Sequence, residues 1–305
     1  MLREPDSGRV RGGIRGIVPA VITVILVYVL ALSVPGLLSA VLDPDSFVVP
    51  LGILGSQWIV YLVAILVALW LAVRLDRRDL ARYGLTVDRG WLVNFFVGIG
   101  ISLLVSAVYF GYGSWRGHFA IHPDRISEFG AIPIPLLIAV VGGSLILILL
   151  ISSWEEVVFR GIMLQNFAEG LRGRGYSPAW AVGVAVLAHA VLFGLYHLPT
   201  FFILAWYTSI VGFIFALAYL VTGKLGLAIG IHFGRFPMEM LTGEELGPVA
   251  LPQVVEIGQN PMSASLEIVI VELVISCALI LVWAFYLHGE LSIAESIYED
   301  TQTDQ

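Results

Sequence analysis

The sequence predicts an all-α fold, a polytopic integral membrane bundle of about eight transmembrane helices, and three observations lead to that prediction. Hydrophobic residues make up 58% of the 305 residues and charged residues 13%, about half the charged fraction of a soluble domain. The mean hydropathy is +0.92. Apolar runs of roughly 20 residues, enough helix to cross a hydrocarbon core, recur along most of the chain.

Each apolar run is taken as one span, which leaves little sequence for a soluble domain. The predicted spans are 17–42, 48–73, 91–113, 132–153, 179–198, 201–221, 225–240 and 268–287. The seventh is short and is interrupted by Arg235 and Pro237. We divide the chain into N-terminal helices with a basic loop (1–130), a transmembrane core that carries ionisable residues within its spans (131–289) and an acidic, solvated cytoplasmic tail (290–305).

Basic residues are distributed unevenly between the two sides of the predicted membrane. The inner segments hold Arg3, Arg9, Arg11, Arg15, Arg74, Arg77, Arg78, Arg82, Arg89, Arg160, Arg172, Arg174 and Lys224. The outer loops hold only Arg116 and Arg125. Because Lys and Arg accumulate in cytoplasmic loops, both termini are predicted to be cytoplasmic, and we expect a prokaryotic cell membrane.

The remaining composition excludes several classes of protein. The net charge of -7 gives no electrostatic footprint for nucleic acid. Cys277 is the only cysteine, which excludes a disulfide framework and a cysteine metal cluster, and we interpret it as a packing residue. The basic N-terminus precedes an apolar run too long for a signal peptide, so the run is taken as the first span.

Ionisable side chains inside a span are costly and therefore suggest function. In the run from Trp154 to Gly161, Glu156 and Arg160 are an i, i+4 pair on one helical face, while Glu155 points away from them. This pattern predicts that Arg160 fixes Glu156 and leaves Glu155 free to act on water or a ligand. The alternative is that both glutamates only mark the cytoplasmic end of the fourth span.

Two histidines are predicted at the depth of Glu155. Counted from the polar turn at 172–178, Glu155 and His197 both lie about 24 to 28 Å along an antiparallel hairpin, and His232 lies about 12 Å from the turn at 222–224. Allowing about 12 Å of hairpin in the cytosol brings all three groups to one level.

Other polar or aromatic residues of these spans receive simpler interpretations. Phe193 can pack beside His197, one turn away. His189 is expected to bond to a neighbouring helix, and Glu272 to make an interhelical hydrogen bond.

These residues resemble a known family. Glu-Glu-x-x-x-Arg at 155–160, Phe-x-x-x-His at 193–197 and the later His232 are similar, in order and spacing, to the CPBP (CAAX protease and bacteriocin-processing, Abi) family of intramembrane endopeptidases. The resemblance covers about 136–240. It implies proteolysis near the C-terminus of prenylated proteins in eukaryotes, and bacteriocin maturation, self-immunity or processing of membrane peptides in prokaryotes. It also implies a site open to the cytosol.

One position departs from the family pattern. The family places Asn or Asp four residues after the last histidine, where this chain has Phe236. The resemblance gives that amide a part in holding the oxyanion. Arg235 and Glu239 share the helical face of His232 and either replace the amide or form an i, i+4 ion pair with each other.

The resulting hypothesis is peptide hydrolysis. Glu155 acts as general base on a water held also by His197, and His232 stabilises the oxyanion, with Glu156 and Arg160 in support. A zinc ion held by Glu155, His197 and His232 is the alternative form of the same site. The expected partners are membrane lipid and a hydrophobic or lipidated peptide or protein.

Two other classes of function stay open from sequence. The first is a proton- or ion-coupled transporter, although the two halves of the chain differ greatly in polar content. The second is a catalytically inactive immunity or scaffold protein, which Phe236 keeps open. No pattern in the sequence predicts the oligomeric state.

Overall fold

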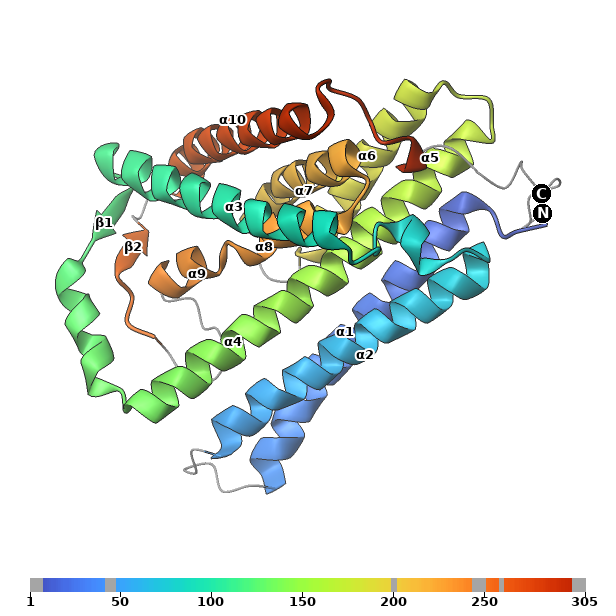
Figure 1. Ribbon diagram of the computed structural model, residues 1–305. Helices are drawn as coiled ribbons and strands as arrows, with labels where there is room; N and C mark the ends of the chain where they lie inside the picture. The colour runs from blue at the N-terminus through green and yellow to red at the C-terminus, as the bar shows by residue number, and fades with distance from the viewer. Residues whose placement is uncertain (1–7, 42–47, 199–201, 243–250, 258–260, 298–305) are drawn as a thin grey trace.

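The computed structural model describes residues 8–41, 48–198, 202–242, 251–257 and 261–297, and the described chain is almost entirely helical (Figure 1). Its elements are α1 (Gly12–Val41), α2 (Val48–Asp76), η1 (Leu80–Tyr83), α3 (Arg89–Trp115), β1 (Phe119–Ile121), η2 (Pro123–Ala131), α4 (Ile134–Glu155), η3 (Glu156–Leu164), α5 (Gln165–Arg172), α6 (Pro178–Tyr196), α7 (Phe202–Thr222), α8 (Leu225–Phe233), α9 (Phe236–Thr242), β2 (Val255–Ile257), α10 (Pro261–His288) and η4 (Glu295–Ile297).

The predicted polytopic helical bundle is confirmed. Seven helices in the described residues are long and apolar enough to cross a membrane, and they coincide with seven of the predicted spans. The fourth continues without interruption through η3 and α5, from Ile134 to Arg172. Residues 42 and 201, at the ends of two predicted spans, lie outside the described residues. The chain is an integral membrane protein.

The predicted span 225–240 is wrong as a single helix. α8 ends at Phe233, the chain turns at Gly234 and Arg235, and α9 begins at Phe236. Together α8 and α9 still follow α3 along most of its length, because Gly226 lies against Trp91 and Leu241 packs in the cluster around Phe119, just after α3. Two short helices therefore replace the predicted span.

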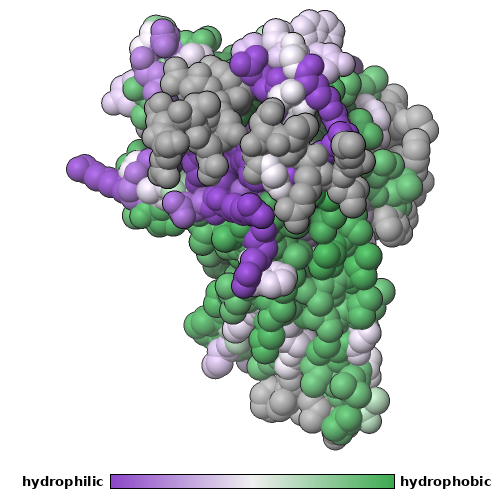
Figure 2. Space-filling model, turned by 90° about the vertical axis from the view of Figure 1, so that its right-hand side faces the viewer, coloured by the Kyte–Doolittle hydropathy of each residue, from purple (hydrophilic) through white to green (hydrophobic). Residues whose placement is uncertain are grey.

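A cluster of buried ion pairs, the arginine cluster, joins α1, α2 and α5 at one end of the bundle. It consists of Arg9, Arg15, Asp76, Arg78 and Glu169. Arg15 Nη1 donates to Asp76 Oδ1 at 2.8 Å, and the Glu169 Oε1 atom lies 2.7 Å from Arg9 Nη2 and 2.6 Å from Arg78 Nη2. We call this the arginine-rich end, and Figure 2 shows hydrophilic side chains gathered on it.

The described beginning of the acidic tail packs on the same end. Gln165 Nε2 donates to Ser296 O at 2.7 Å, and Ile297 is 1% exposed. The expectation of a solvated tail is therefore wrong at Ile297, because an apolar side chain gains from burial against α5, whereas residues 290–293 are exposed. Residues 298–305 lie outside the described part of the chain.

The opposite end carries the sheet, and we call it the β end. β1 pairs antiparallel with β2, with Phe119 opposite Ile257. Arg125 Nη1 donates to the carbonyl oxygen of Gln253 at 3.0 Å. Arg116 pairs with Glu267 at 3.0 Å.

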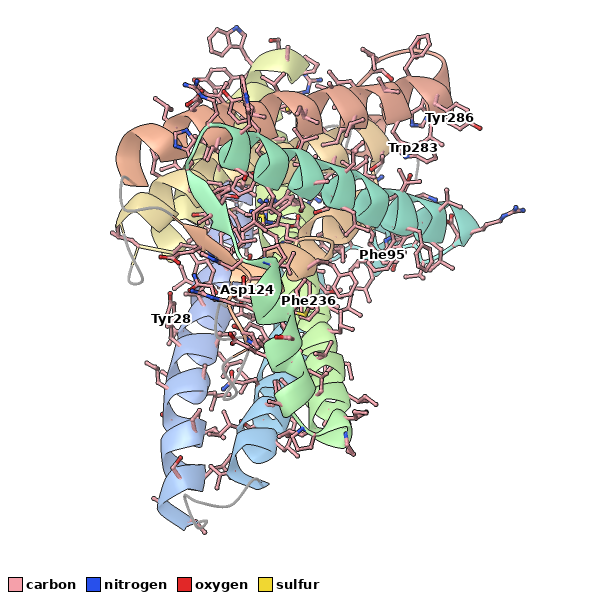
Figure 3. The ribbon with its side chains drawn as sticks, turned by 90° about the vertical axis from the view of Figure 1, so that its left-hand side faces the viewer. Tyr28, Phe95, Asp124, Phe236, Trp283 and Tyr286 are labelled. Atoms are coloured by element: carbon pink, nitrogen blue, oxygen red, sulfur yellow. The ribbon has the colours of Figure 1, made fainter. Side chains whose placement is uncertain are left out.

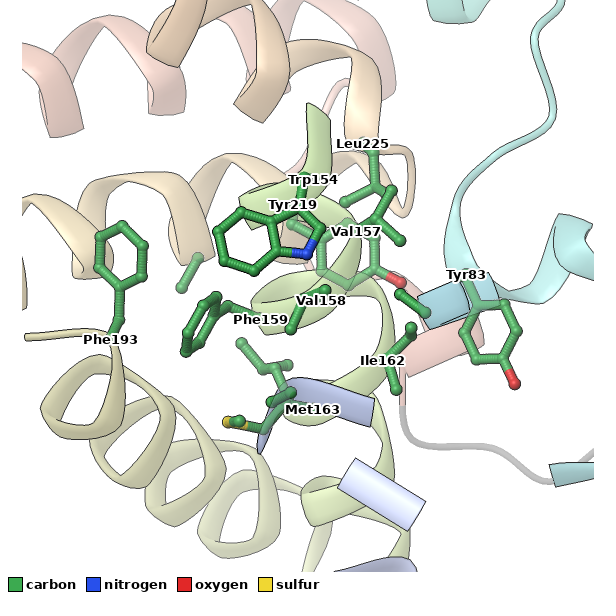
Figure 4. Packing of buried hydrophobic residues seen from close by; sticks show 14 of the residues in the cluster. Tyr83, Trp154, Val157, Val158, Phe159, Ile162, Met163, Phe193, Tyr219 and Leu225 are labelled. Carbon is green, nitrogen blue, oxygen red and sulfur yellow. The ribbon is translucent and has the colours of Figure 1, made fainter. Parts of the chain in front are cut away.

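The core between the two ends is built on η3, a π-helix whose nine residues are all buried. Trp154, Phe159, Ile162 and Met163 form its centre, packed against Tyr83 and Leu225 (Figure 4). A π-helix inside a longer helix is rare and often marks a functional site. Here it carries the Glu-Glu-x-x-x-Arg motif.

Glycines bring α8 close to α3. Gly226, Gly230 and Gly234 recur every four residues along α8 and its end, so they line one face. A Cβ on Gly230 would lie 2.1 Å from the backbone oxygen of Phe95. Small residues at this spacing let membrane helices approach closely. The sequence analysis missed this contact, which sets the position of the helix that carries His232.

Candidate active site

The side chains of Glu155, His197 and His232 meet, as the matching depths predicted. Glu155 is the last residue of α4 and is 4% exposed. His197 Nε2 lies 3.9 Å from Glu155 Oε1, and His232 Nε2 lies 3.8 Å from Glu155 Oε2. One imidazole therefore faces each oxygen of a single buried carboxylate.

The backbone of α6 fixes the orientation of His197. Its Nδ1 lies 2.9 Å from the carbonyl oxygen of Phe193. A carbonyl can only accept, so Nδ1 carries the hydrogen, and the neutral ring presents a lone pair at Nε2. The Phe193 ring packs edge-on with its centroid 4.8 Å away, as predicted, and the Tyr196 ring packs edge-on with its centroid 4.6 Å away.

Glu156 holds His232 in the equivalent way. His232 Nδ1 lies 2.9 Å from Glu156 Oε1, and Arg160 Nη1 donates to the same oxygen at 3.1 Å. The His232 ring also stacks on Phe215, with centroids 4.6 Å apart and planes 13° from parallel. Both imidazoles thus have Nδ1 engaged and Nε2 directed at Glu155.

Arg160 is fully buried and joins three helices. It donates to Glu156 and, through Nη2, to the carbonyl oxygen of Gly212 in α7 at 3.2 Å. Its guanidinium lies 4.2 Å from the ring centroid of Phe193 and 5.0 Å from that of Phe215. The predicted Glu156–Arg160 pair is therefore present. It bonds to His232 directly, and its guanidinium lies over the ring of Phe193, which packs against His197.

The comparisons with known proteins agree with this arrangement. Residues 136–235 match the family model described as type II CAAX prenyl endopeptidase Rce1-like. This segment, called here the Rce1-like segment, is similar to that family. The match confirms the resemblance to the CPBP and CAAX protease family and ends near the predicted limit, at the turn after α8. Neither the search of curated proteins nor that of solved structures gave a match.

Aromatic side chains from outside the Rce1-like segment complete the surroundings of Glu155. The Tyr28 hydroxyl of α1 donates to the carbonyl oxygen of Tyr196 at 2.9 Å, and Tyr61 of α2 packs 5.7 Å from Trp154. Both tyrosines lie close enough to Glu155 to interact with its charge. The sequence analysis missed them because nothing in the pattern of α1 or α2 marks those positions.

Arg235 does not take a position beside the reacting groups. It bonds to Glu272 of α10 and to the hydroxyl of Tyr207 in α7, and Tyr207 donates to Glu272 at 2.8 Å. The interhelical hydrogen bond predicted for Glu272 is therefore confirmed. Arg235 braces the break between α8 and α9, and Glu239 also interacts electrostatically with it.

Phe236 occupies the family's Asn or Asp position but lies beyond that break. It is the first residue of α9 and is 5% exposed. Because α8 ends at Phe233, residue 236 does not continue the helical face of His232.

His189 and Cys277 lie apart from the three groups. His189 is fully buried and bonds through Nδ1 to the carbonyl oxygen of Val186 in its own helix, at 2.8 Å. The expected bond to a neighbouring helix is wrong for this atom. Cys277 is a partly buried free thiol of α10.

The donor types at the site are those of a zinc centre, although their spacing is wide. Two imidazole Nε2 atoms and one carboxylate face one another, and each imidazole is held at Nδ1, as in metal-binding histidines. A tetrahedral zinc site with bonds of about 2.0–2.1 Å has ligand atoms roughly 3.3 Å apart. Among the described residues, no group of three or more His, Cys, Asp or Glu side chains is close enough to hold a metal ion as it stands.

Proposed function

We propose that this integral membrane protein is an intramembrane endopeptidase that hydrolyses a peptide bond in a hydrophobic or lipidated peptide or protein. The observation that supports this proposal most directly is the position of the Glu155 carboxylate between His197 Nε2 at 3.9 Å and His232 Nε2 at 3.8 Å. These gaps are too long for direct hydrogen bonds. A water molecule that bridges a carboxylate and an imidazole lone pair fits such a separation.

Glu155 is the proposed general base. No described residue donates a hydrogen bond to its carboxylate, so both oxygens are available to a water. As the water oxygen bonds to the scissile carbonyl carbon, Glu155 accepts the water's proton, and a tetrahedral oxyanion forms. Transfer of that proton to the peptide nitrogen breaks the C–N bond and releases an amine and a carboxylic acid.

The two imidazoles have different proposed roles because their Nδ1 partners differ. His197 bonds to a neutral carbonyl, so its Nε2 lone pair orients the water. His232 bonds to the Glu156 carboxylate, which stabilises the imidazolium form against the opposing effects of burial and of Arg160. In that form Nε2–H can donate to the oxyanion and stabilise the transition state. This assignment needs no amide at position 236.

A metal ion would be held by Glu155, His197 and His232. When bound, zinc supplies a Lewis acid and a more acidic water. The roles of Glu156 and Arg160 in holding His232 are the same with or without it. Metal analysis of the purified protein tests this part of the proposal separately from cleavage.

Cleavage profiling of a hydrophobic peptide pool by the purified protein tests the proposal. Glu155→Gln and His197→Ala should each lower the cleavage rate by about 10²–10⁴-fold, as expected for loss of a general base or its partner. The matched controls are Glu290→Gln and His288→Ala, both at exposed positions. Retained cleavage in both site variants contradicts the proposal. No cleavage by the folded wild type would favour an inactive binding protein.

A further inference from the structure

We infer that one water molecule is bound inside the membrane between α3 and α10, where it links three buried serine hydroxyls beside the Arg235–Glu272 pair. We call this place the serine cavity. None of the three groups proposed for hydrolysis lines it. The water site is therefore independent of the proposed function.

α3 and α10 run antiparallel, and a polar contact toward each end fixes their register. Trp283 Nε1 donates to Asn94 Oδ1 at 2.9 Å. At the β end the Tyr112 hydroxyl donates to Glu267. In Figure 3 the two helices neighbour each other, with Trp283 of α10 and Phe95 of α3 labelled.

These two bonds bring polar residues of the two helices to the same level. Ser102 lies eight residues from the first bond along α3, and Ser276 lies seven residues from it along α10. Counted from the second bond, Ser106 is six residues away and Glu272 is five. At 1.5 Å per residue these distances are about 8–12 Å. Each helix thus presents an i, i+4 polar pair in the middle of the contact.

A cavity lies between the two polar pairs. All three serines line it, and Arg235 reaches it from the break between α8 and α9. The rest of its wall is mainly apolar and comes from α7 and α8. Its volume is about 10 Å³, which is of the order needed for one water molecule. A peptide side chain or a lipid headgroup is too large for it.

The serine hydroxyls need a partner that the protein does not supply. Ser102, Ser106 and Ser276 are 4%, 8% and 2% exposed. Arg235 and Glu272 bond to each other, and none of the three hydroxyls makes a hydrogen bond to a residue in the described part of the chain. A hydroxyl withdrawn from water without a hydrogen bond is destabilising, and a bound water removes that cost.

The lining favours a neutral ligand that both donates and accepts hydrogen bonds. Arg235 disfavours a cation here, and Glu272 disfavours an anion because it neutralises Arg235. Hydroxyl groups can donate and accept, and water matches them in both respects. A buried water typically makes about three hydrogen bonds. Bonded to hydroxyls on both helices, the water connects α3 to α10, and both helices lie outside the Rce1-like segment.

Alanine substitutions test the water site through the sign of their effect on stability. In Ser106→Ala and Ser276→Ala the bound water loses a hydrogen bond, so the unfolding temperature in detergent should fall by roughly 2–4 °C. Ser152→Ala is the matched control. Its hydroxyl is buried and has no partner among the described residues, but it does not line the cavity. Removal of that unsatisfied hydroxyl should leave the unfolding temperature unchanged or raise it.

The Ser106→Ala, Ser276→Ala double variant tests whether one water is shared. Because both hydroxyls bond to the same molecule, the second substitution should lower the unfolding temperature less than it does alone. Two losses that simply add would overturn the inference. An unfolding temperature that is unchanged or raised in both single variants, as in Ser152→Ala, would overturn it as well.

Radiolytic labelling of the wild-type protein needs no variant to fold. X-ray radiolysis of a bound water releases hydroxyl radicals, which oxidise the side chains around it. Ile214 lines the cavity and is 2% exposed, whereas Ile162 lies in the η3 core and is 0% exposed. Ile214 should be oxidised several times faster than Ile162, as measured by mass spectrometry of the digested protein. Equal rates for the two isoleucines would show that the cavity is dry.

Discussion

Two clusters of buried charge contact the same long helix, and their acidic groups have different hydrogen-bond partners. In the arginine cluster, Asp76 accepts from Arg15, Tyr83 and Asn166 at 2.7–2.8 Å. At the site, Glu155 accepts no hydrogen bond from a described residue and faces two imidazoles at 3.8–3.9 Å. A buried carboxylate with full protein partners stabilises the fold, whereas one left for water is available for chemistry.

Glu156 shares properties with both Asp76 and Glu155. It is fully buried and pairs with Arg160 at 3.1 Å, like a member of the arginine cluster, yet the same oxygen holds His232 at 2.9 Å. The comparison therefore predicts a graded series. Changes at Asp76 should affect stability, changes at Glu155 activity, and changes at Glu156 both.

The largest effect on stability is expected for Asp76→Asn. The substitution leaves Arg15, which is fully buried, without the charge of its closest partner, and breaking a buried ion pair costs about 3–5 kcal/mol. Tyr83 cannot replace the lost charge, because burial raises the pKa of its hydroxyl well above the usual range. Thermal unfolding in detergent measures the loss.

Asp79→Asn, at an exposed position three residues after Asp76, is the control and should unfold like wild type. Cleavage per folded molecule should be unchanged in Asp76→Asn. Lost cleavage with an unchanged unfolding temperature would mean that the arginine cluster takes part in the chemistry, and the contrast between the clusters would fail.

Glu156→Gln should have a smaller but double effect. The neutral amide no longer places a negative charge beside His232 Nδ1, and loss of such an orienting partner typically costs about 10–100-fold in activity. Stability should fall as well, because Arg160 loses its charged partner. Cleavage kinetics and thermal unfolding are measured on the same preparations.

A double variant distinguishes orientation from simple structural damage. If Glu156 acts through His232 on the chemistry of Glu155, the Glu155→Gln, Glu156→Gln double variant should be no slower than Glu155→Gln alone. Additive losses in cleavage would show that Glu156 contributes only by supporting the fold.

The sequence was informative about the site because regular helices convert residue counts into depth. Glu155, His197 and His232 could be brought to one level from two turns and a rise of 1.5 Å per residue. Hydropathy predicted seven of the spans correctly, because a span is recognised from the composition of one continuous stretch of sequence. Pro237 indicated an interruption in the predicted span 225–240. Only the structure shows that the chain turns at Gly234 and Arg235.

The parts that sequence could not predict depend on packing between distant segments. Nothing near Tyr28 or Tyr61 indicates that α1 and α2 line the site. Nothing near Glu169 indicates three arginine partners from two other segments. Such contacts follow from how helices dock and not from local periodicity.

Gly230→Ala should alter the spacing at the site without removing a charge. The new Cβ would lie 2.1 Å from the backbone oxygen of Phe95, so α8 must shift away from α3 and carry His232 with it. Overpacking of this kind costs about 1–3 kcal/mol. Gly183→Ala is the matched control, because its Cβ would meet nothing within 4 Å.

Cleavage should fall in Gly230→Ala beyond its loss of folded protein, because hydrolysis at Glu155 needs His232 at its observed distance. A stable Gly230→Ala protein with wild-type cleavage would mean that the gap between His232 and Glu155 does not limit the reaction.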